Sequence, residues 1–134
     1  MKGTELILLF ICILSVAAGG LLYLYIRPDA LLSRAVGMFI SIKPAYINSD
    51  FVNYYLCDML WAFSLVLALF LVIKRRVAAV LIAAGFSIIT ELLQLLGIMP
   101  GTFDFYDILA ETVAEAAAVL LIMLLCGRKK YEAQ

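Results

Sequence analysis

Residues 51–73 read FVNYYLCDMLWAFSLVLALFLVI and are followed at once by the basic triplet Lys74-Arg75-Arg76. An α-helix needs about 20 consecutive apolar residues to cross the hydrocarbon core of a bilayer. The stretch has this length, and a basic cluster directly after it is typical of the cytoplasmic end of a membrane span. It therefore predicts a transmembrane helix that runs towards the cytoplasm.

Three more stretches of this kind flank it, at about residues 6–26, 77–98 and 105–126. Hydrophobic residues make up 66% of the chain and charged residues 15%, whereas soluble domains are roughly 45–50% apolar and about a quarter charged. The sequence thus predicts one all-α membrane domain over residues 1–134, a bundle of four transmembrane helices in a lipid bilayer. Ten basic and ten acidic residues leave no positive excess for binding nucleic acid.

The loop between the first two spans contains a shorter apolar segment, of about 14 residues up to Pro44. Ser33, Gly37 and Ser41 recur in it at every fourth position, which places small residues along one face of a helix. The segment is too short to span a membrane, so it predicts an interfacial or re-entrant helix in the first outer loop. Aromatic residues follow it and predict a belt at the outer interface: Tyr46, Phe51, Tyr54, Tyr55 and Trp61.

Acidic residues within the spans are the main chemical feature of the sequence. Asp58, Glu91 and Glu111 each lie about 9–12 Å below the outer end of their helix, given a rise of 1.5 Å per residue. Glu115 lies one turn deeper. Because exposure of a charge to lipid is costly, we expect these acids to gather on the protein-facing sides of their helices.

Helical spacing extends this acidic site into two polar ridges. Residues at i, i+3, i+4 and i+7 form a ridge on the third span, and acids at every fourth position form one on the fourth span. We expect the two ridges to face each other or a shared cavity. Asp104 and Asp107 also fit the capping of the fourth helix. The ridges consist of Ser87, Thr90, Glu91 and Gln94, and of Asp107, Glu111 and Glu115.

Several arrangements would neutralise these acids. In the first, some of the acids are protonated. In the second, Arg34 (with Arg27 or Lys43) reaches in from the outer loop, and in the third a cation occupies the site. A purely structural alternative is that the carboxyl groups, Thr90 and Gln94 only hydrogen-bond and fix the helix packing. The chain has no histidine, and its three cysteines lack metal-ligand spacing, so they are expected to be small buried residues.

The segment Thr90-Glu91-Leu92-Leu93-Gln94, together with residues 100–109 (PGTFDFYDIL), resembles the VanZ-like family. These are small multi-pass bacterial membrane proteins, and the founding member is associated with resistance to the glycopeptide teicoplanin. The resemblance implies a cell-envelope protein of the bacterial plasma membrane. Its matching positions are Glu91, Gln94, Pro100, Gly101, Phe103, Asp104 and Asp107.

Together these observations indicate an outward-facing acidic pocket for a cationic or amine-bearing ligand, a metal ion or a lipid headgroup, including a lipid-linked one. Such a role is more typical of a non-enzymatic protein, and it is compatible with a homo-oligomer. Two alternatives remain: a small proton-coupled transporter, or an outer-leaflet enzyme with a carboxylate-held metal. The candidate binding residues are Asp58, Thr90, Glu91, Gln94, Asp104, Asp107, Glu111, Glu115 and Arg34.

The basic clusters predict the topology. Lys74-Arg75-Arg76 and Arg128-Lys129-Lys130 lie on the same side of a four-span bundle, so both termini are expected in the cytoplasm and residues 28–50 and 100–104 outside. A cysteine introduced at Ser49 should react with an impermeant thiol reagent added from outside. Labelling from the cytoplasmic side alone would overturn this topology.

Overall fold

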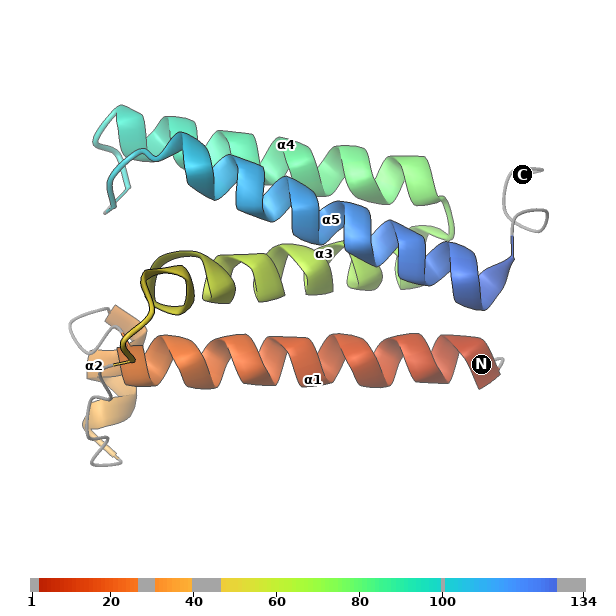
Figure 1. The fold of residues 1–134 in the computed structure, drawn as a ribbon, viewed down its shortest axis with the longest axis horizontal. Coiled ribbons are helices and arrows are strands. Elements are labelled where there is room, and N and C mark those ends of the chain that lie inside the picture. The colour runs from red at the N-terminus through yellow and green to blue at the C-terminus, as the bar shows by residue number, and fades with distance from the viewer. Residues whose placement is uncertain (1–2, 27–30, 40–46, 100, 128–134) are drawn as a thin grey trace.

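The computed structural model describes residues 3–26, 31–39, 47–99 and 101–127, and all regular elements in these ranges are helical (Figure 1). Four helices are long and apolar enough to cross a membrane, so the predicted all-α bundle of a multi-pass membrane protein is confirmed. In chain order the elements are α1 (Gly3–Ile26), α2 (Leu31–Gly37), the π-helix η1 (Val52–Leu56), α3 (Cys57–Ile73), α4 (Arg76–Leu95) and α5 (Phe105–Cys126).

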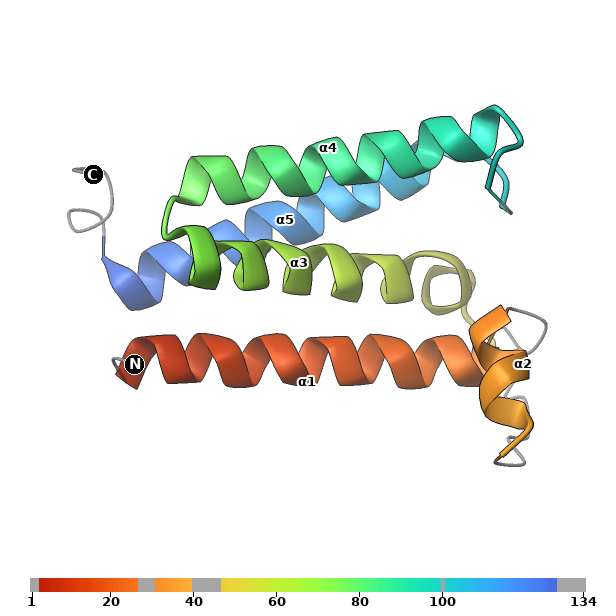
Figure 2. The ribbon, with the colours of Figure 1, turned by 180° about the vertical axis from the view of Figure 1, so that it is seen from behind.

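The long helices run up and down along one axis (Figures 1 and 2). The start of α1, the α3–α4 turn and the end of α5 lie at one end of the bundle, and α2 and the α4–α5 connection lie at the other. We call the latter the α2 end. The alternation expected for four spans is therefore present in the fold.

Helix α3 is the centre of the bundle, because α1, α4 and α5 all pack against it. Val66, Leu67 and Phe70 of α3 are at most 1% exposed. They form a core with small residues of α4 and α5, which allow close approach of the backbones. The core also includes Leu8, Cys12, Ala79, Ala83, Ala118 and Ile122.

Two cysteines join α1 to α3. The Cys12 thiol donates to the carbonyl oxygen of Ser64 at 3.4 Å, and the Cys57 thiol donates to that of Gly19 at 3.3 Å. Both residues are buried and Cys126 is partly buried, and none of the three forms a disulfide with another described residue. The expectation of small buried residues is confirmed for Cys12 and Cys57.

Gly19 lets α1 approach α3 at the level of Trp61. A Cβ atom at this position would lie 2.6 Å from Cδ1 and from Nε1 of the Trp61 ring. The indole is thus packed directly against the α1 backbone, which only glycine leaves accessible at this distance.

The turn between α3 and α4 lies at the end opposite α2. Lys74 adopts a left-handed conformation (φ 63°), and its backbone N–H donates to the carbonyl oxygen of Phe70. Its side chain forms a 3.0 Å ion pair with Glu5. Part of the basic triplet therefore also holds the start of α1 against the end of α3.

Two predicted boundaries are wrong. Helix α4 ends at Leu95, not Ile98, because Gly97 (φ 68°) ends it in a Schellman motif, in which the N–H of Ile98 donates to the carbonyl oxygen of Leu93. Helix α2 covers Leu31–Gly37, about half of the length predicted for the helix in the first outer loop. Ser41 and Pro44, which were expected to belong to that helix and to end it, lie outside the described residues.

Two adjacent glycines of α1 offer a matched test of this packing. We expect Gly19→Ala to lower the free energy of unfolding by about 1–3 kcal/mol, as overpacking in a tight core does. Gly20→Ala should change it by no more than about 1 kcal/mol, since no atom lies within 4 Å of a Cβ atom at Gly20. Thermal unfolding in a neutral detergent measures both. Equal effects of the two variants would contradict the packing of Trp61 on Gly19.

Candidate binding site

A cavity of about 1010 Å³ lies towards the α2 end of the bundle. Its walls come from α1, η1, α3, α4, α5 and the α4–α5 connection. Helix α3 forms the back of the cavity, since α1 and α4 each pack on α3 and not along each other. Every transmembrane helix thus contributes to one shared space.

The charged residues in the described part of this wall are all acidic. Five carboxyl groups line the cavity, and the lining that the structure describes contains no lysine or arginine. The predicted gathering of acids from α3, α4 and α5 around one space is therefore present. The five are Asp58, Glu91, Asp104, Asp107 and Glu111.

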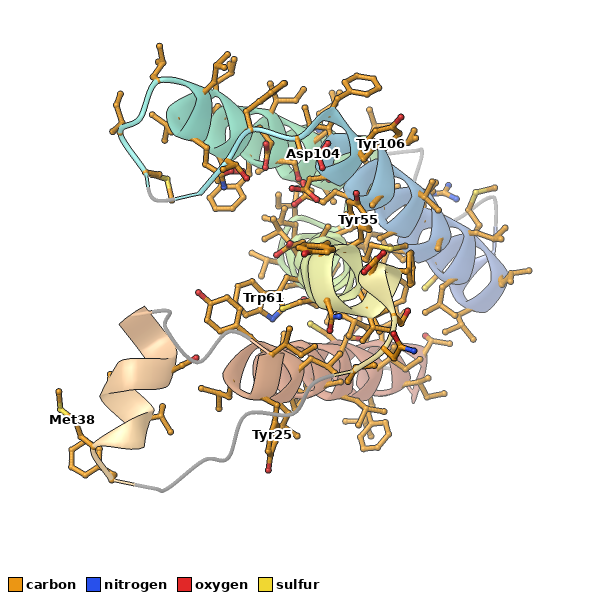
Figure 3. All side chains as sticks on the ribbon, turned by 60° about the vertical axis from the view of Figure 1, so that its left-hand side comes forward. Tyr25, Met38, Tyr55, Trp61, Asp104 and Tyr106 are labelled. Carbon is orange, nitrogen blue, oxygen red and sulfur yellow. The ribbon has the colours of Figure 1, made fainter. Side chains whose placement is uncertain are left out.

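Glu91 and Asp104 connect α4 to the start of α5. The Asp104 backbone N–H donates to Oε2 of Glu91 at 3.2 Å, and Glu91 is only 4% exposed. Asp104 Oδ1 accepts from the backbone N–H of Tyr106 at 2.9 Å, so Asp104 is the N-cap of α5, as predicted. Its Oδ2 faces the Tyr55 hydroxyl, which donates at 3.5 Å (Figure 3).

A second group of acids lies deeper, around Ser87. The Ser87 hydroxyl donates to Oε1 of Glu115 at 3.5 Å, and both residues are buried. Glu115 does not line the cavity but lies behind Ser87, which does. Glu111 lines the cavity, and its Oε2 atom is buried without a hydrogen-bond partner among the described residues. A buried carboxyl oxygen without a partner is the group that a bound ligand would satisfy.

Thr90 and Gln94 have structural roles. The Thr90 hydroxyl donates to the carbonyl oxygen of Ser87 at 2.8 Å, a bond within its own helix. Gln94 packs beneath Gly101, where a Cβ atom would lie 2.7 Å from the Gln94 side chain. Gly101 has φ 140°, which only glycine adopts readily. Both predicted residues line the cavity, and the structural interpretation accounts for their contacts.

An aromatic pair stands on the side of the cavity formed by α1 and α3. The rings of Tyr23 and Trp61 are stacked, with centroids 5.3 Å apart and an interplanar angle of 29°. Trp61 projects from α3 beside α1 (Figure 3). Sequence reasoning assigned Trp61 to an interfacial belt and did not single out Tyr23. Gly19 is the signal that points to this pair, since a glycine inside a span often marks a close approach of another helix.

The π-helix η1 was not predicted either. Asn53 and Tyr54 of η1 line the cavity, and Tyr55 bonds to Asp104. π-Helical turns occur frequently at functional sites. The segment contains no proline or glycine that would have indicated the change from an α-helix to a π-helix.

Two further predictions concern basic side chains from the loop after α1 and a bound metal ion. The side chain of Arg34, and Arg27 and Lys43, lie outside the described residues. Among the side chains that the structure describes, no three acidic or cysteine residues converge as a group that could hold a metal ion. The carboxyl groups are instead spread along the cavity wall.

Comparison of the chain with models of known protein families, with curated proteins and with solved structures finds no match. What the cavity binds therefore has to follow from the chemistry of its own walls.

The capping role of Asp104 is separable from its charge. Asp104→Ala should lower the free energy of unfolding by about 0.5–2 kcal/mol, because the Tyr106 N–H loses its acceptor. Asp104→Asn keeps a capping oxygen and should stay close to the native value. Chemical or thermal unfolding followed by circular dichroism compares the two. Equal losses in both variants would show that the carboxylate charge, and not the cap, stabilises this corner.

Proposed function

We propose that this membrane protein is a VanZ-like protein of the bacterial cell envelope whose acidic cavity binds a ligand through a positively charged amine. The observation that carries the proposal is the composition of the cavity wall: five carboxyl groups with no lysine or arginine in the described lining. The VanZ-like resemblance connects such a role to glycopeptide resistance.

The energetics of the bilayer favour a cationic occupant. A charged side chain in the middle of a membrane costs about 2.5–3.5 kcal/mol on insertion scales. Several carboxylates around one cavity also repel one another. A bound cation offsets both costs, and the unpartnered Oε2 of Glu111 gives it a direct acceptor.

An amine explains the cavity better than a metal ion does. Metal ions such as Ca²⁺ require several oxygen ligands converging at 2.3–2.6 Å, and the described residues do not form such a group. The stacked Tyr23–Trp61 pair also lines the cavity. Aromatic faces attract ammonium groups, and quaternary amines above all, through cation–π interactions.

The cavity faces the outer side in this proposal. Lys74 and Arg75 lie in the α3–α4 turn, at the end of the bundle opposite α2. The positive-inside rule places that end in the cytoplasm, with both termini, and the α2 end outside. The site is then open to the envelope of a bacterial plasma membrane.

Binding fits the bundle better than transport or catalysis. The described core at the end opposite α2 is apolar, with Leu8, Phe70 and Ile122 almost completely buried. It supplies no polar path that continues the cavity towards the cytoplasm. The Ser87 hydroxyl lines the cavity and donates to the Glu115 carboxyl group, but their 3.5 Å separation is longer than the roughly 2.6–3.2 Å typical of a nucleophile activated by a base.

Trp61 is the only tryptophan of the chain and lines the cavity, so its fluorescence reports on the site. The water-soluble quaternary ammonium ion benzyltrimethylammonium should change this fluorescence saturably and raise the unfolding temperature of the protein in a neutral detergent. The double variant Glu91→Gln/Glu111→Gln should bind it at least tenfold more weakly, because each glutamine keeps the shape but loses the charge.

Asp50→Asn is the matched control, since this exposed acid does not line the cavity. It should leave binding unchanged. Stabilisation that persists in the double variant would show that the carboxyl groups do not bind the amine, and no saturable response in the native protein would refute the proposal.

A further inference from the structure

The cavity changes character along its depth. Away from the carboxyl groups its walls are mostly apolar, and they come from three different helices. On α3 alone the lining extends from Asp58 to Ala68, ten positions later, which is about 15 Å along a helix. One space therefore combines a charged region at the Asp58 level with an apolar region that continues down to Ala68. The apolar lining includes Cys12, Val16, Leu65, Ala68 and Phe86.

The apolar region is open to the side of the bundle. Val16, Trp61 and Phe86 line the cavity, yet they are 49%, 37% and 60% exposed. Val16 and Phe86 lie near the middle of α1 and α4, which do not pack along each other. In a membrane this opening faces the hydrocarbon of the bilayer, not water.

The charges of the wall restrict the head of an occupant. Phosphate groups are bound in proteins mainly by arginine, lysine and backbone N–H groups, and the described lining has no basic side chain. The carboxyl groups would repel a phosphate. A headgroup with a net positive charge fits this wall, whereas a zwitterionic phospholipid does not.

We propose that the ligand is a cationic amphiphile that enters from the bilayer between α1 and α4. Its amine lies among Glu91, Glu111 and Asp58, next to the Tyr23–Trp61 pair, and its alkyl chain lies along Val16, Leu65 and Ala68. This inference rests on the proposed amine-binding function and adds the chain and the lateral route to it.

Bromine quenches tryptophan fluorescence on contact, so a brominated alkyl chain that reaches Trp61 lowers the fluorescence of the protein. The protein in neutral detergent micelles is titrated with dibrominated octadecylamine. Dibrominated stearic acid has the same chain with a negative head, and a phosphatidylethanolamine with brominated chains has a zwitterionic head. We expect saturable quenching by the amine at a mole fraction at least tenfold lower than that required for the other two.

Two variants separate the chain from the head. Ala68→Leu fills the deep end of the apolar region, and Val16→Phe narrows the opening from a half-exposed position that the core does not depend on. Each variant should weaken binding of the brominated amine at least fivefold. The affinity for benzyltrimethylammonium should stay within twofold of the native value. Ala117→Leu adds the same side chain as Ala68→Leu on an exposed part of α5 outside the cavity and should change neither. Thermal unfolding confirms that each variant is folded.

The outcomes distinguish the two proposals. Suppose that benzyltrimethylammonium binds but that the brominated amine binds no more tightly than the brominated acid. The amphiphile proposal is then refuted and the amine site stands. The same conclusion follows if neither cavity variant weakens binding of the brominated amine. Quenching by the brominated phospholipid equal to that by the amine would refute the net-cationic head. If benzyltrimethylammonium does not bind to the native protein, the amine site is refuted, and the amphiphile proposal that rests on it fails with it.

Discussion

The cost of exposing a carboxyl group to lipid is the constraint on which the rest of this structure depends. The hydrocarbon core offers neither water nor counter-ions, so acids within the spans have to turn towards the protein. Glu91 and Glu115 are at most 4% exposed, whereas Leu81 of α4 and Leu124 of α5 are 67% and 74% exposed. The polar residues therefore orient α4 and α5, and the apolar residues cover the outside.

Helix α3 brings the other long helices together around one cavity. It packs against the three other long helices, and its residues form the back of the cavity. Because α1 and α4 lie on different sides of α3, the space between them is not filled by helix packing. The cavity is a consequence of this arrangement: three helices around a central α3 leave the space between α1 and α4 open.

The same residues stabilise the fold and shape the site. Asp104 caps α5, accepts from the Tyr55 hydroxyl and donates its backbone N–H to Glu91, and it also lines the cavity. Trp61 fills the space over Gly19 and stands in the cavity wall. Substitutions at such positions affect stability and binding together, which is why conservative variants and matched controls are needed to separate the two.

The sequence by itself determined the four spans and their order, because hydrophobic length is a local property of the chain. It overestimated the depth of Glu91, since α4 ends at Leu95. It also predicted the Asp104 cap, which is a contact between near neighbours. Only the tertiary structure decided that Tyr23 stacks on Trp61, that Tyr55 reaches Asp104 through a π-helix, and that Ser87 separates the cavity from Glu115. These contacts join residues far apart in the chain, and they depend on how each helix is rotated and on which helices touch. Spacing within one helix predicts which face turns towards the protein, but it carries no information on which residues of another helix that face meets.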